Sequence, residues 1–299
     1  MNILITGGTG LVGSRLSQLL SEQGHQVSHL SRKENLKAQF PAYRWNIDKM
    51  EIDDRAITNA DAIIHLAGTG IADARWSEAR KKDIVDSRVK STQLIAEAIQ
   101  LTGHKPKAFI SASAVGYYGN AGNQLCTEDM PSTEQSFLAE TCRLWEGSTQ
   151  AISALGIRVA IARVGIVLST QGGALAKMLP TYSIGVGGHF GGVWTSWIHI
   201  DDICGIFMHL LQNKNLSGPF NGVAPNPVTS LDLAKGIRDA KGTFAFLAPA
   251  PTFVLKLAMG EMAEVVLQSC KASSDKITKA GYVFKFPALV PAIKDLLGK

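Results

Sequence analysis

The fold is decided by the first thirteen residues, Met1-Asn2-Ile3-Leu4-Ile5-Thr6-Gly7-Gly8-Thr9-Gly10-Leu11-Val12-Gly13. Residues 2–5 form a short, mainly apolar run, as in a central parallel strand, and apolar residues recur with helical spacing after Gly10. Between them, Gly7, Gly10 and Gly13 form the pattern G-x-x-G-x-x-G. A glycine turn lets the backbone approach a phosphate closely, and the N-terminus of the following helix attracts its negative charge. The stretch therefore predicts a nucleotide-binding turn, with a simple chain reversal as the structural alternative.

The composition indicates a globular α/β protein. The chain has 299 residues, of which 45% are hydrophobic and 18% charged. It has no uncharged apolar run of about 18 residues, and Met1 leads directly into a strand, so we expect a cytoplasmic protein without a membrane span. The basic residues are scattered, which argues against a nucleic-acid partner. The four cysteines lie far apart, so neither a disulfide framework nor a metal site is expected.

Strands and helices alternate along the first half of the chain. The expected strands are residues 2–5, 25–30, 42–45, 60–66, 107–112 and 157–163. Six strands in this pattern predict a Rossmann-type doubly wound parallel sheet with helices on both faces. Two long helices are expected at 75–99 and 137–155, and pairing of these helices between two copies would give a homodimer.

The character of the sequence changes after residue 165, where a smaller, mostly helical C-terminal lobe is expected. We assign 1–165 to the dinucleotide-binding domain and 166–299 mostly to this lobe, with part of 195–215 returning to the first domain. The glycine-rich stretch 185–192 predicts a mobile loop or a hairpin bend. Residues 197–202 predict a strand whose final aspartates cap a helix from Ile203. His199 and Asp201 would share a strand face, and we favour a structural role for them over a catalytic one.

The end of the second strand indicates which cofactor is bound. An NAD-binding fold usually has an Asp or Glu here for the ribose hydroxyls. This chain instead has Ser31-Arg32-Lys33. The guanidinium of Arg32 can donate two hydrogen bonds to a 2′-phosphate, so NADP(H) is predicted. Asn46 and Ile47 follow the third strand, where adenine would lie. Two exposed basic residues in a turn are the alternative interpretation.

Further cofactor contacts are expected at the carboxyl ends of the other strands and on the long helix. His65 is interpreted as a packed core residue, and Arg88 as a residue that points into the cleft. The complete predicted cofactor set is Gly7, Thr9, Gly10, Leu11, Val12, Gly13, Ser31, Arg32, Lys33, Asn46, Ile47, Leu66, Ala67, Gly68, Thr69, Arg88, Ser111 and Arg163.

Motifs along nearly the whole chain carry a family resemblance. The sequence resembles the extended short-chain dehydrogenase/reductase superfamily, in particular its NAD(P)-dependent sugar-nucleotide epimerase and dehydratase group. More narrowly, it resembles the atypical branch called "epimerase family protein", which has a C-terminal domain of unknown function. The matching segments are residues 6–13, 65–68, 75–76, 87–88, 111–119, 143–146, 196–202, 221–229 and 281–284.

The sequence differs from the family at the two residues that catalyse the reaction in active members. Active members of the superfamily use a tyrosine and, four residues later, a lysine, together with a serine from the fifth strand. Counting back from the family's glutamate, here Glu146, the resemblance places Leu138 and Cys142 in those two positions. Ser113 occupies the serine position.

The phenols near the fifth strand are Tyr117 and Tyr118, and one of them would have to replace the missing acid/base. The candidate catalytic residues are therefore Ser113, Tyr117 and Tyr118. Packing at the strand exit is the alternative role for the tyrosines.

Two functions remain open at this stage. The resemblance implies an NADP(H)-dependent oxidoreductase or epimerase that acts on a hydroxyl or carbonyl compound, such as a sugar nucleotide. The missing Tyr and Lys favour, as the alternative, a non-catalytic protein that senses NADPH and regulates a partner.

Overall fold

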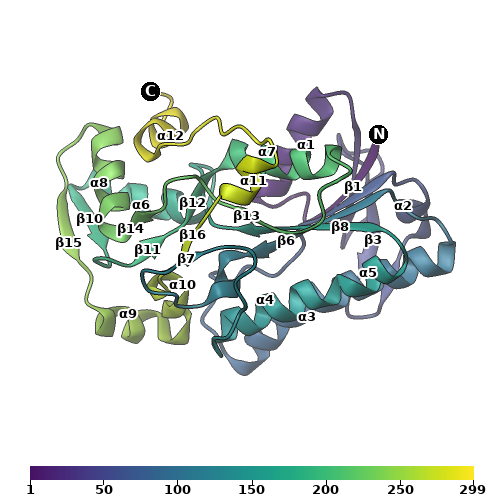
Figure 1. Ribbon diagram of the computed structural model, residues 1–299, viewed down its shortest axis with the longest axis horizontal. Coiled ribbons are helices and arrows are strands. Elements are labelled where there is room, and N and C mark those ends of the chain that lie inside the picture. The colour runs from purple at the N-terminus through teal and green to yellow at the C-terminus, as the bar shows by residue number, and fades with distance from the viewer.

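An eight-stranded sheet runs through the centre of the protein (Figure 1). The computed structural model describes residues 1–299, except for the side chain of Ala258. In spatial order the strands are β13 (Gly218–Gly222), β8 (Arg158–Val164), β6 (Ala108–Ala114), β5 (Ala62–His65), β1 (Asn2–Thr6), β2 (Gln26–Ser31), β3 (Ala42–Asn46) and β4 (Glu51–Ile52). Neighbours pair in parallel, apart from β3 and β4, which are antiparallel.

The strand order reverses beside β1. From β1 the chain first builds outward through β2 and β3, and then returns to add β5, β6, β8 and β13 on the other side. In open parallel sheets a ligand crevice lies at this reversal, outside the carboxyl ends of the strands. The predicted doubly wound sheet is confirmed, and its crevice lies at the ends of β1 and β5.

The sheet has two more strands than the sequence analysis predicted. β4 is a short edge strand, whereas β13 extends the parallel sheet beyond β8, with Gly218 opposite Ala160. The segment Gly218-Pro219-Phe220-Asn221-Gly222 lacks the apolar alternation of a strand, and its Gly and Pro are typical of a turn. β13 also lies beyond the part of 195–215 that the sequence analysis returned to the sheet domain.

Helices cover both faces of the sheet (Figure 1). One face carries α1 (Leu11–Glu22), α7 (Ile200–Gln212) and α11 (Asp275–Lys279), which bury residues such as Leu16, Phe207 and Ile277 against the strands. The opposite face carries α2 (Asp54–Thr58), α3 (Glu78–Thr102), α4 (Phe137–Ser148) and α5 (Gln150–Ala154). Burial of these apolar side chains on both faces is the main favourable contribution to folding.

Capping groups set helix bounds that differ from the predicted ones. α3 begins at Glu78 rather than residue 75, because the side chain of Ser77 accepts a hydrogen bond from the backbone N–H of Arg80. The predicted helix 137–155 is divided into α4 and α5 at Thr149. The Thr149 hydroxyl donates to the carbonyl of Glu146 at 2.7 Å, a local bond that competes with the regular helix ladder.

α7 begins at Ile200 rather than Ile203, so the predicted aspartate cap was wrong. The cap is His199, whose Nδ1 accepts from the backbone N–H of Asp201 at 3.0 Å. Asp201 therefore lies in the helix and not on a strand face, and it forms an ion pair with Arg15 of α1 at 2.7 Å. Asp202 is buried and accepts bonds from the backbone N–H groups of Lys285 and Phe286.

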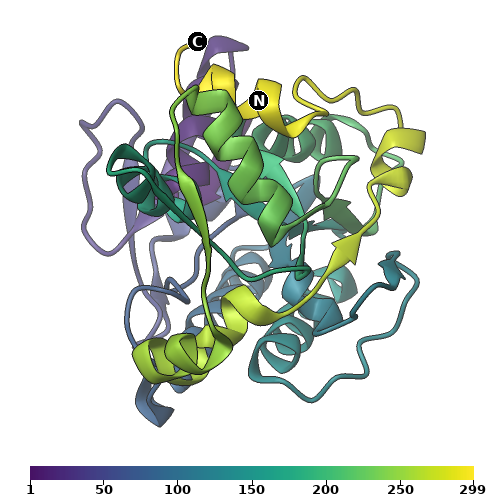
Figure 2. The same ribbon diagram turned by 90° about the vertical axis from the view of Figure 1, so that its left-hand side faces the viewer.

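A second core lies beside the sheet in the C-terminal lobe (Figure 1, left). It is formed around Trp197 and Tyr182 by α6 (Gly173–Ser183), α8 (Ser230–Lys241) and α12 (Leu289–Leu296). Four two-stranded ladders complete this region: β9 (Ile166–Leu168) with β12 (Trp197–His199), β10 (Val186–His189) with β15 (Phe246–Pro249), β11 (Trp194–Thr195) with β14 (Val228–Thr229), and β7 (Leu125–Cys126) with β16 (Lys271–Ala272). Figure 2 shows the chain passing from β15 into α9 (Thr252–Met259) and then α10 (Glu264–Leu267).

The glycine-rich stretch 185–192 is neither a hairpin bend nor an unpaired loop. Residues Val186–His189 form β10, which pairs in parallel with β15. A Cβ on Gly187 would lie 2.6 Å from Cζ of Tyr182, so this glycine lets the strand pack directly on that ring.

Among the helices that the structure describes, none combines the length and the apolar composition that a membrane span requires.

Candidate functional site

The glycine turn between β1 and α1 forms a cradle that side chains would fill. Gly7 has a φ of +69°, in the left-handed region, and a Cβ on it would lie 2.9 Å from the carbonyl carbon and oxygen of Leu66. A Cβ on Gly13 would lie 2.2 Å from the carbonyl oxygen of Gly7. The turn is closed by a hydrogen bond from the N–H of Gly10 to the same oxygen at 3.0 Å. Glycine is therefore required at Gly7 and Gly13 by the backbone itself.

The N-terminus of α1 is available to an anion. The helix begins at Leu11 after the N-cap Gly10, and none of the side chains that the structure describes caps it. The first N–H groups of a helix lack intrahelical partners, and its dipole favours negative charge there. Thr9 and Gly10 are exposed beside these groups. The geometry suits a pyrophosphate held by the backbone of residues 10–13.

A buried polar network joins this cradle to the exit of β5. The hydroxyl oxygen of Thr6 accepts from the backbone N–H groups of Leu66 and Ala67 at 3.1 and 3.0 Å, and lies 2.8 Å from Nδ1 of His65. On its other side, Nε2 of His65 lies 3.2 Å from the hydroxyl of Thr92 on α3. His65 therefore holds β1, β5 and α3 together under the cradle, in line with the predicted core role.

The stability of the protein is expected to depend on pH through His65. Burial disfavours the charged imidazolium and lowers the pKa of His65 to about 3 from 6.5. Below pH 6.5 the unfolded chain therefore gains a proton that the folded protein does not. From this group, the free energy of unfolding should fall by about 1 kcal/mol between pH 7.5 and 5.5. Urea unfolding at both pH values measures the effect.

His65→Gln should remove that part of the pH dependence, whereas the control His104→Gln should keep it. An unchanged pH dependence in His65→Gln would contradict the assignment.

The residues predicted to select the cofactor lie at the ends of β2 and β3. Arg32 and Lys33 are exposed directly after Ser31, which ends β2. Ser31 is paired with Arg44 of the neighbouring strand, so the two strand ends are adjacent. Asn46 ends β3, and its side chain accepts from the N–H of Lys49 at 3.1 Å. Ile47 is half-buried against the core of the α3 face.

A buried ion pair occupies the exit of β6. Ser113, which is 2% exposed, donates its hydroxyl proton to Oε1 of Glu146 at 2.7 Å. Arg163 binds the same carboxylate with both Nε and Nη2, at 2.8 Å each. The guanidinium of Arg163 also donates to the hydroxyl of Tyr118 at 3.0 Å, and that hydroxyl donates to Oδ1 of Asn221 at 2.7 Å. These elements (β6, α4, β8 and β13) are thus tied together by one polar network.

This network changes the roles expected for several predicted residues. Tyr118 is 4% exposed, its hydroxyl is bound on both sides, and burial raises its pKa above the ordinary value. Such a phenol cannot exchange a proton with a substrate, so the geometry argues against the predicted catalytic role. Arg163, at 2% exposure, is occupied by Glu146 and Tyr118 rather than facing a cofactor. Ser111 is fully buried within β6.

The hydroxyl of Ser113 is no better placed for acid/base chemistry, and the ring of Tyr117 packs on Arg163. Because Ser113 donates to Glu146, its oxygen is left only as an acceptor. The ring of Tyr117 lies against the guanidinium of Arg163, 3.5 Å from Cζ to the ring centroid. Ser113 therefore has no proton to donate to a substrate oxygen unless the Glu146 bond breaks.

An inner cavity of about 270 Å³ lies beside the β6 exit. Leu138 and Cys142 of α4 line it. These are the residues at the two positions where the resemblance implies tyrosine and lysine. Burial raises the pKa of the Cys142 thiol to about 11, so it is neutral at pH 7. As far as the structure describes them, the lining residues include neither Tyr117 nor Tyr118. Apart from the two thiols, the ionisable group among them is Arg88, from α3.

The C-terminal lobe supplies a wall of this cavity that sequence reasoning missed. Val265, Val266, Gln268 and Cys270 line it from α10 and the segment after it. Nothing in this short apolar run indicates a ligand site, because it faces the cavity only after the lobe has packed against the sheet domain.

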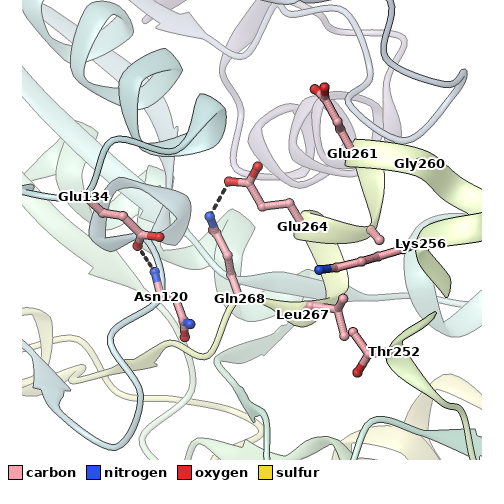
Figure 3. A pocket seen from close by; sticks show the side chains of 10 residues that line it. Asn120, Glu134, Thr252, Lys256, Gly260, Glu261, Glu264, Leu267 and Gln268 are labelled. Carbon is pink, nitrogen blue, oxygen red and sulfur yellow. Dashed lines mark hydrogen bonds between the residues drawn. The ribbon is translucent and has the colours of Figure 1, made fainter.

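A second, outer pocket of about 610 Å³ adjoins the inner one (Figure 3). Gln268 lines both, and its amide donates to Glu264 and to Ser136. Lys256 extends from α9 into the outer pocket, and Glu134 binds the backbone N–H of Asn120. The pocket is lined by three carboxylates, Glu134, Glu261 and Glu264, and one ammonium group, Lys256.

Comparison with known protein families agrees with this arrangement. The model of the NAD dependent epimerase/dehydratase family matches residues 3–221. The chain belongs to this family. A second family model, of a domain of unknown function (DUF1731), matches residues 250–296, which confirms the resemblance seen in the sequence.

Similar proteins match nearly the whole chain. The "Epimerase family protein YfhF" of Bacillus subtilis is 36% identical over 301 residues, covering 99% of this chain and 98% of that protein. The chloroplastic homologue of "Epimerase family protein SDR39U1" from Arabidopsis thaliana is 34% identical over 305 residues, covering 99% and 87%. The crystal structure of human epimerase family protein SDR39U1 (isoform2) with NADPH superposes with a TM-score of 0.89, at 32% identity, covering 100% of this chain and 99% of that one.

Proposed function

We propose that this protein binds NADPH along the carboxyl edge of the sheet and exchanges hydride with a small carbonyl or hydroxyl compound held in the inner cavity. The observation that carries the proposal is the cradle at Gly7 and Gly13, which side chains would fill, above the uncapped N-terminus of α1. The structure of the human relative with NADPH supports the choice of cofactor. When bound, NADPH would supply the hydride to the carbonyl carbon, and the carbonyl oxygen would take its proton from a solvent water, because the side chains that line the cavity offer none.

The chain's own groups would hold the cofactor in the following way. The backbone of residues 10–13 binds the pyrophosphate, and Arg32 and Lys33 bind the 2′-phosphate. The segment 66–69, held to β1 by Thr6, passes beside the cofactor and orients it. The mainly apolar lining of the inner cavity, including Val115, Leu138 and Trp145, surrounds the reacting end and limits its contact with bulk water.

The outer pocket favours a small substrate over a sugar nucleotide. A nucleoside diphosphate carries negative charge that is usually matched by arginine or lysine. Here three carboxylates and one lysine face the space next to the inner cavity. Repulsion from Glu134 and Glu264 would oppose a diphosphate at this position, whereas Glu261 is ion-paired with Lys81.

A second candidate is a non-catalytic NADPH sensor, and one observation favours it. Among the described residues of the inner cavity, none is a tyrosine, lysine, histidine or carboxylate that would transfer a proton. A sensor requires NADPH binding without turnover. The test measures oxidation of NADPH in the presence of small aldehydes and ketones. Oxidation that is lost in Cys142→Trp, a substitution that fills the cavity, would favour the enzyme. Binding of NADPH without oxidation would favour the sensor.

Arg32→Asp tests the cofactor assignment. We expect NADPH affinity to fall by about 10- to 100-fold, because a charge-assisted bidentate contact is replaced by repulsion. NADH affinity should stay the same or rise, since the new carboxylate suits the ribose hydroxyls. Calorimetric titration of both coenzymes measures the preference.

Lys37→Asp, the same charge change nearby on the surface, is the control and should leave the preference intact. If the unmodified protein binds neither coenzyme at millimolar concentration, the proposed function fails. Cytoplasmic location and a homodimer formed through α3 and α4 stay predictions.

A further inference from the structure

Two cysteines that are far apart in the sequence meet where the C-terminal lobe joins the sheet domain. Cys126 lies in β7, and Cys270 directly precedes β16, the strand that pairs with β7. Both belong to one small buried cluster, with exposures of 0% and 6%. The ladder partner of Cys126 is Ala272, two residues after Cys270, and side chains two residues apart along a strand point to the same face. The register therefore places the two thiols on one face of this ladder.

The backbone on each side of the pair is held by hydrogen bonds to other segments. The carbonyl of Cys126 accepts from the N–H of Ser273 at 2.9 Å. The N–H of Cys270 donates to the carbonyl of Trp194 at 3.1 Å, and its carbonyl accepts from the hydroxyl of Ser196 at 2.9 Å. These bonds fix the positions of both cysteines in the folded protein, so the thiols stay close to each other.

The two thiols differ from the other cysteines in having each other as a partner. Cys126 and Cys270 share a hydrogen bond, which stabilises the thiolate of Cys126 and lowers its pKa below the ordinary value. Burial instead raises the pKa of Cys142 to about 11 and that of Cys204 to about 12. The thiolate is the form of cysteine that attacks an oxidant. Of the four cysteines, the pair is therefore the one arranged to react.

The inner cavity gives a small oxidant a path to this pair. Cys270 lines the cavity, whose volume of about 270 Å³ easily holds hydrogen peroxide, a molecule little larger than water. Cys142 lines the same cavity, but its hydrogen-bonded neighbour is the hydroxyl of Ser113 and not a second thiol. Access to the cavity is thus common to two cysteines, whereas a thiol partner distinguishes Cys270.

A purely apolar role for the pair explains its burial only. Buried cysteine behaves as a small hydrophobic residue, and the cluster around the pair includes Tyr118 and Val223. Such a role would not require the two sulfurs to contact each other, nor one of them to line a cavity. Both features are those of a cysteine pair that can be oxidised.

We propose that Cys126 and Cys270 form a peroxide-responsive modification site, at which a disulfide joins the C-terminal lobe to the sheet domain. One sulfur attacks hydrogen peroxide, the O–O bond breaks, and a sulfenic acid and one water form. The other thiol then attacks that sulfur, the S–S bond forms, and the S–O bond breaks as a second water leaves with the thiol proton. The two thiols lose two electrons and two protons, and the peroxide is reduced to two waters.

The disulfide would act on the inner cavity. It would tie the wall segment 265–270 to the loop that contains Cys126, so this wall could no longer move away from the sheet domain. The inference goes beyond the proposed function and does not depend on it.

The test treats the whole reduced protein with a small excess of hydrogen peroxide and maps its unreduced peptides by mass spectrometry. We expect the peptides of Cys126 and Cys270 to be linked, with the loss of two hydrogen atoms, while Cys142 and Cys204 stay reduced. Titratable thiols in urea should fall from four to two, and dithiothreitol should restore them. The oxidised protein should unfold at a higher urea concentration, because the bridge restricts the unfolded chain.

Cys142→Ser is the matched control, because it removes a thiol from the same cavity and should leave the bridge intact. Cys126→Ala should abolish the bridge and the shift in urea unfolding, since alanine suits the buried position but has no sulfur. If this variant does not fold, Cys270→Ala serves the same purpose, and the peptide map of the unmodified protein is decisive without either. Oxidation in urea should instead give mixed pairings that include Cys204, because only the fold selects the partner.

Three results would overturn the inference. The first is a folded protein whose four thiols all survive peroxide. The second is oxidation that ends at sulfenic or sulfinic acid without a bridge. The third is a bridge from Cys270 to Cys142 in place of Cys126. Failure of NADPH to bind would reject the proposed function alone, since none of these measurements uses the coenzyme.

Discussion

Gly13→Ala is expected to abolish NADPH binding and to lower the free energy of unfolding by about 2–4 kcal/mol. The added Cβ would lie 2.2 Å from the carbonyl oxygen of Gly7 and 2.8 Å from Cα of Gly8. Both neighbours belong to the backbone, so no side-chain rotation relieves the clash, and the turn has to open. An opened turn no longer presents its N–H groups to a phosphate. Calorimetric titration with NADPH and urea unfolding measure the two effects.

Gly147→Ala is the matched control for this substitution. Gly147 lies inside α4, and a Cβ on it would meet nothing within 4 Å. Alanine is the better helix former, so the control should be neutral or stabilising by about 0.5–1 kcal/mol, with NADPH affinity unchanged. Normal NADPH binding by Gly13→Ala would show that the cradle does not hold the coenzyme.

Arg163→Gln is expected to lower the free energy of unfolding by about 3–5 kcal/mol, because it leaves the buried carboxylate of Glu146 without its cation. The pair is bidentate, with side-chain exposures of 3% for Arg163 and 12% for Glu146. The substitution also removes the bond to Tyr118, so β8 loses its connection to both α4 and the β6 exit. Urea unfolding at pH 7 measures the change.

The control is Arg238→Gln, which removes an exposed ion pair with Asp239 on α8. Exposed pairs contribute little, so its cost should stay within about 0.5 kcal/mol. A cost below about 1 kcal/mol for Arg163→Gln would mean that the buried pair is replaced by water or by another partner, and the network at the β6 exit would lose its assigned role.

The parts of the site that could be predicted are those encoded by neighbouring residues. The glycine spacing indicated the turn because strand, turn and helix follow one another within thirteen residues. Arg32 was recognised because it directly follows β2. The β6 exit was recognised as a polar cluster, but its bonds were not, because Ser113, Glu146 and Arg163 lie on β6, α4 and β8. Because these residues lie far apart along the chain, the sequence did not indicate that the hydroxyl of Ser113 would donate to Glu146.

By itself, the sequence determined the doubly wound sheet, the glycine cradle and the basic corner beside it. These features depend on local chain conformation and on the alternation of apolar segments, which neighbouring residues specify. The tertiary structure alone decided how the polar groups are used: it buried Tyr118 and Arg163 in a network and placed Arg88 at the wall of a cavity. The physical reason is that burial and hydrogen-bond partners arise only when distant elements pack together, so residue type does not reveal which donors are left free.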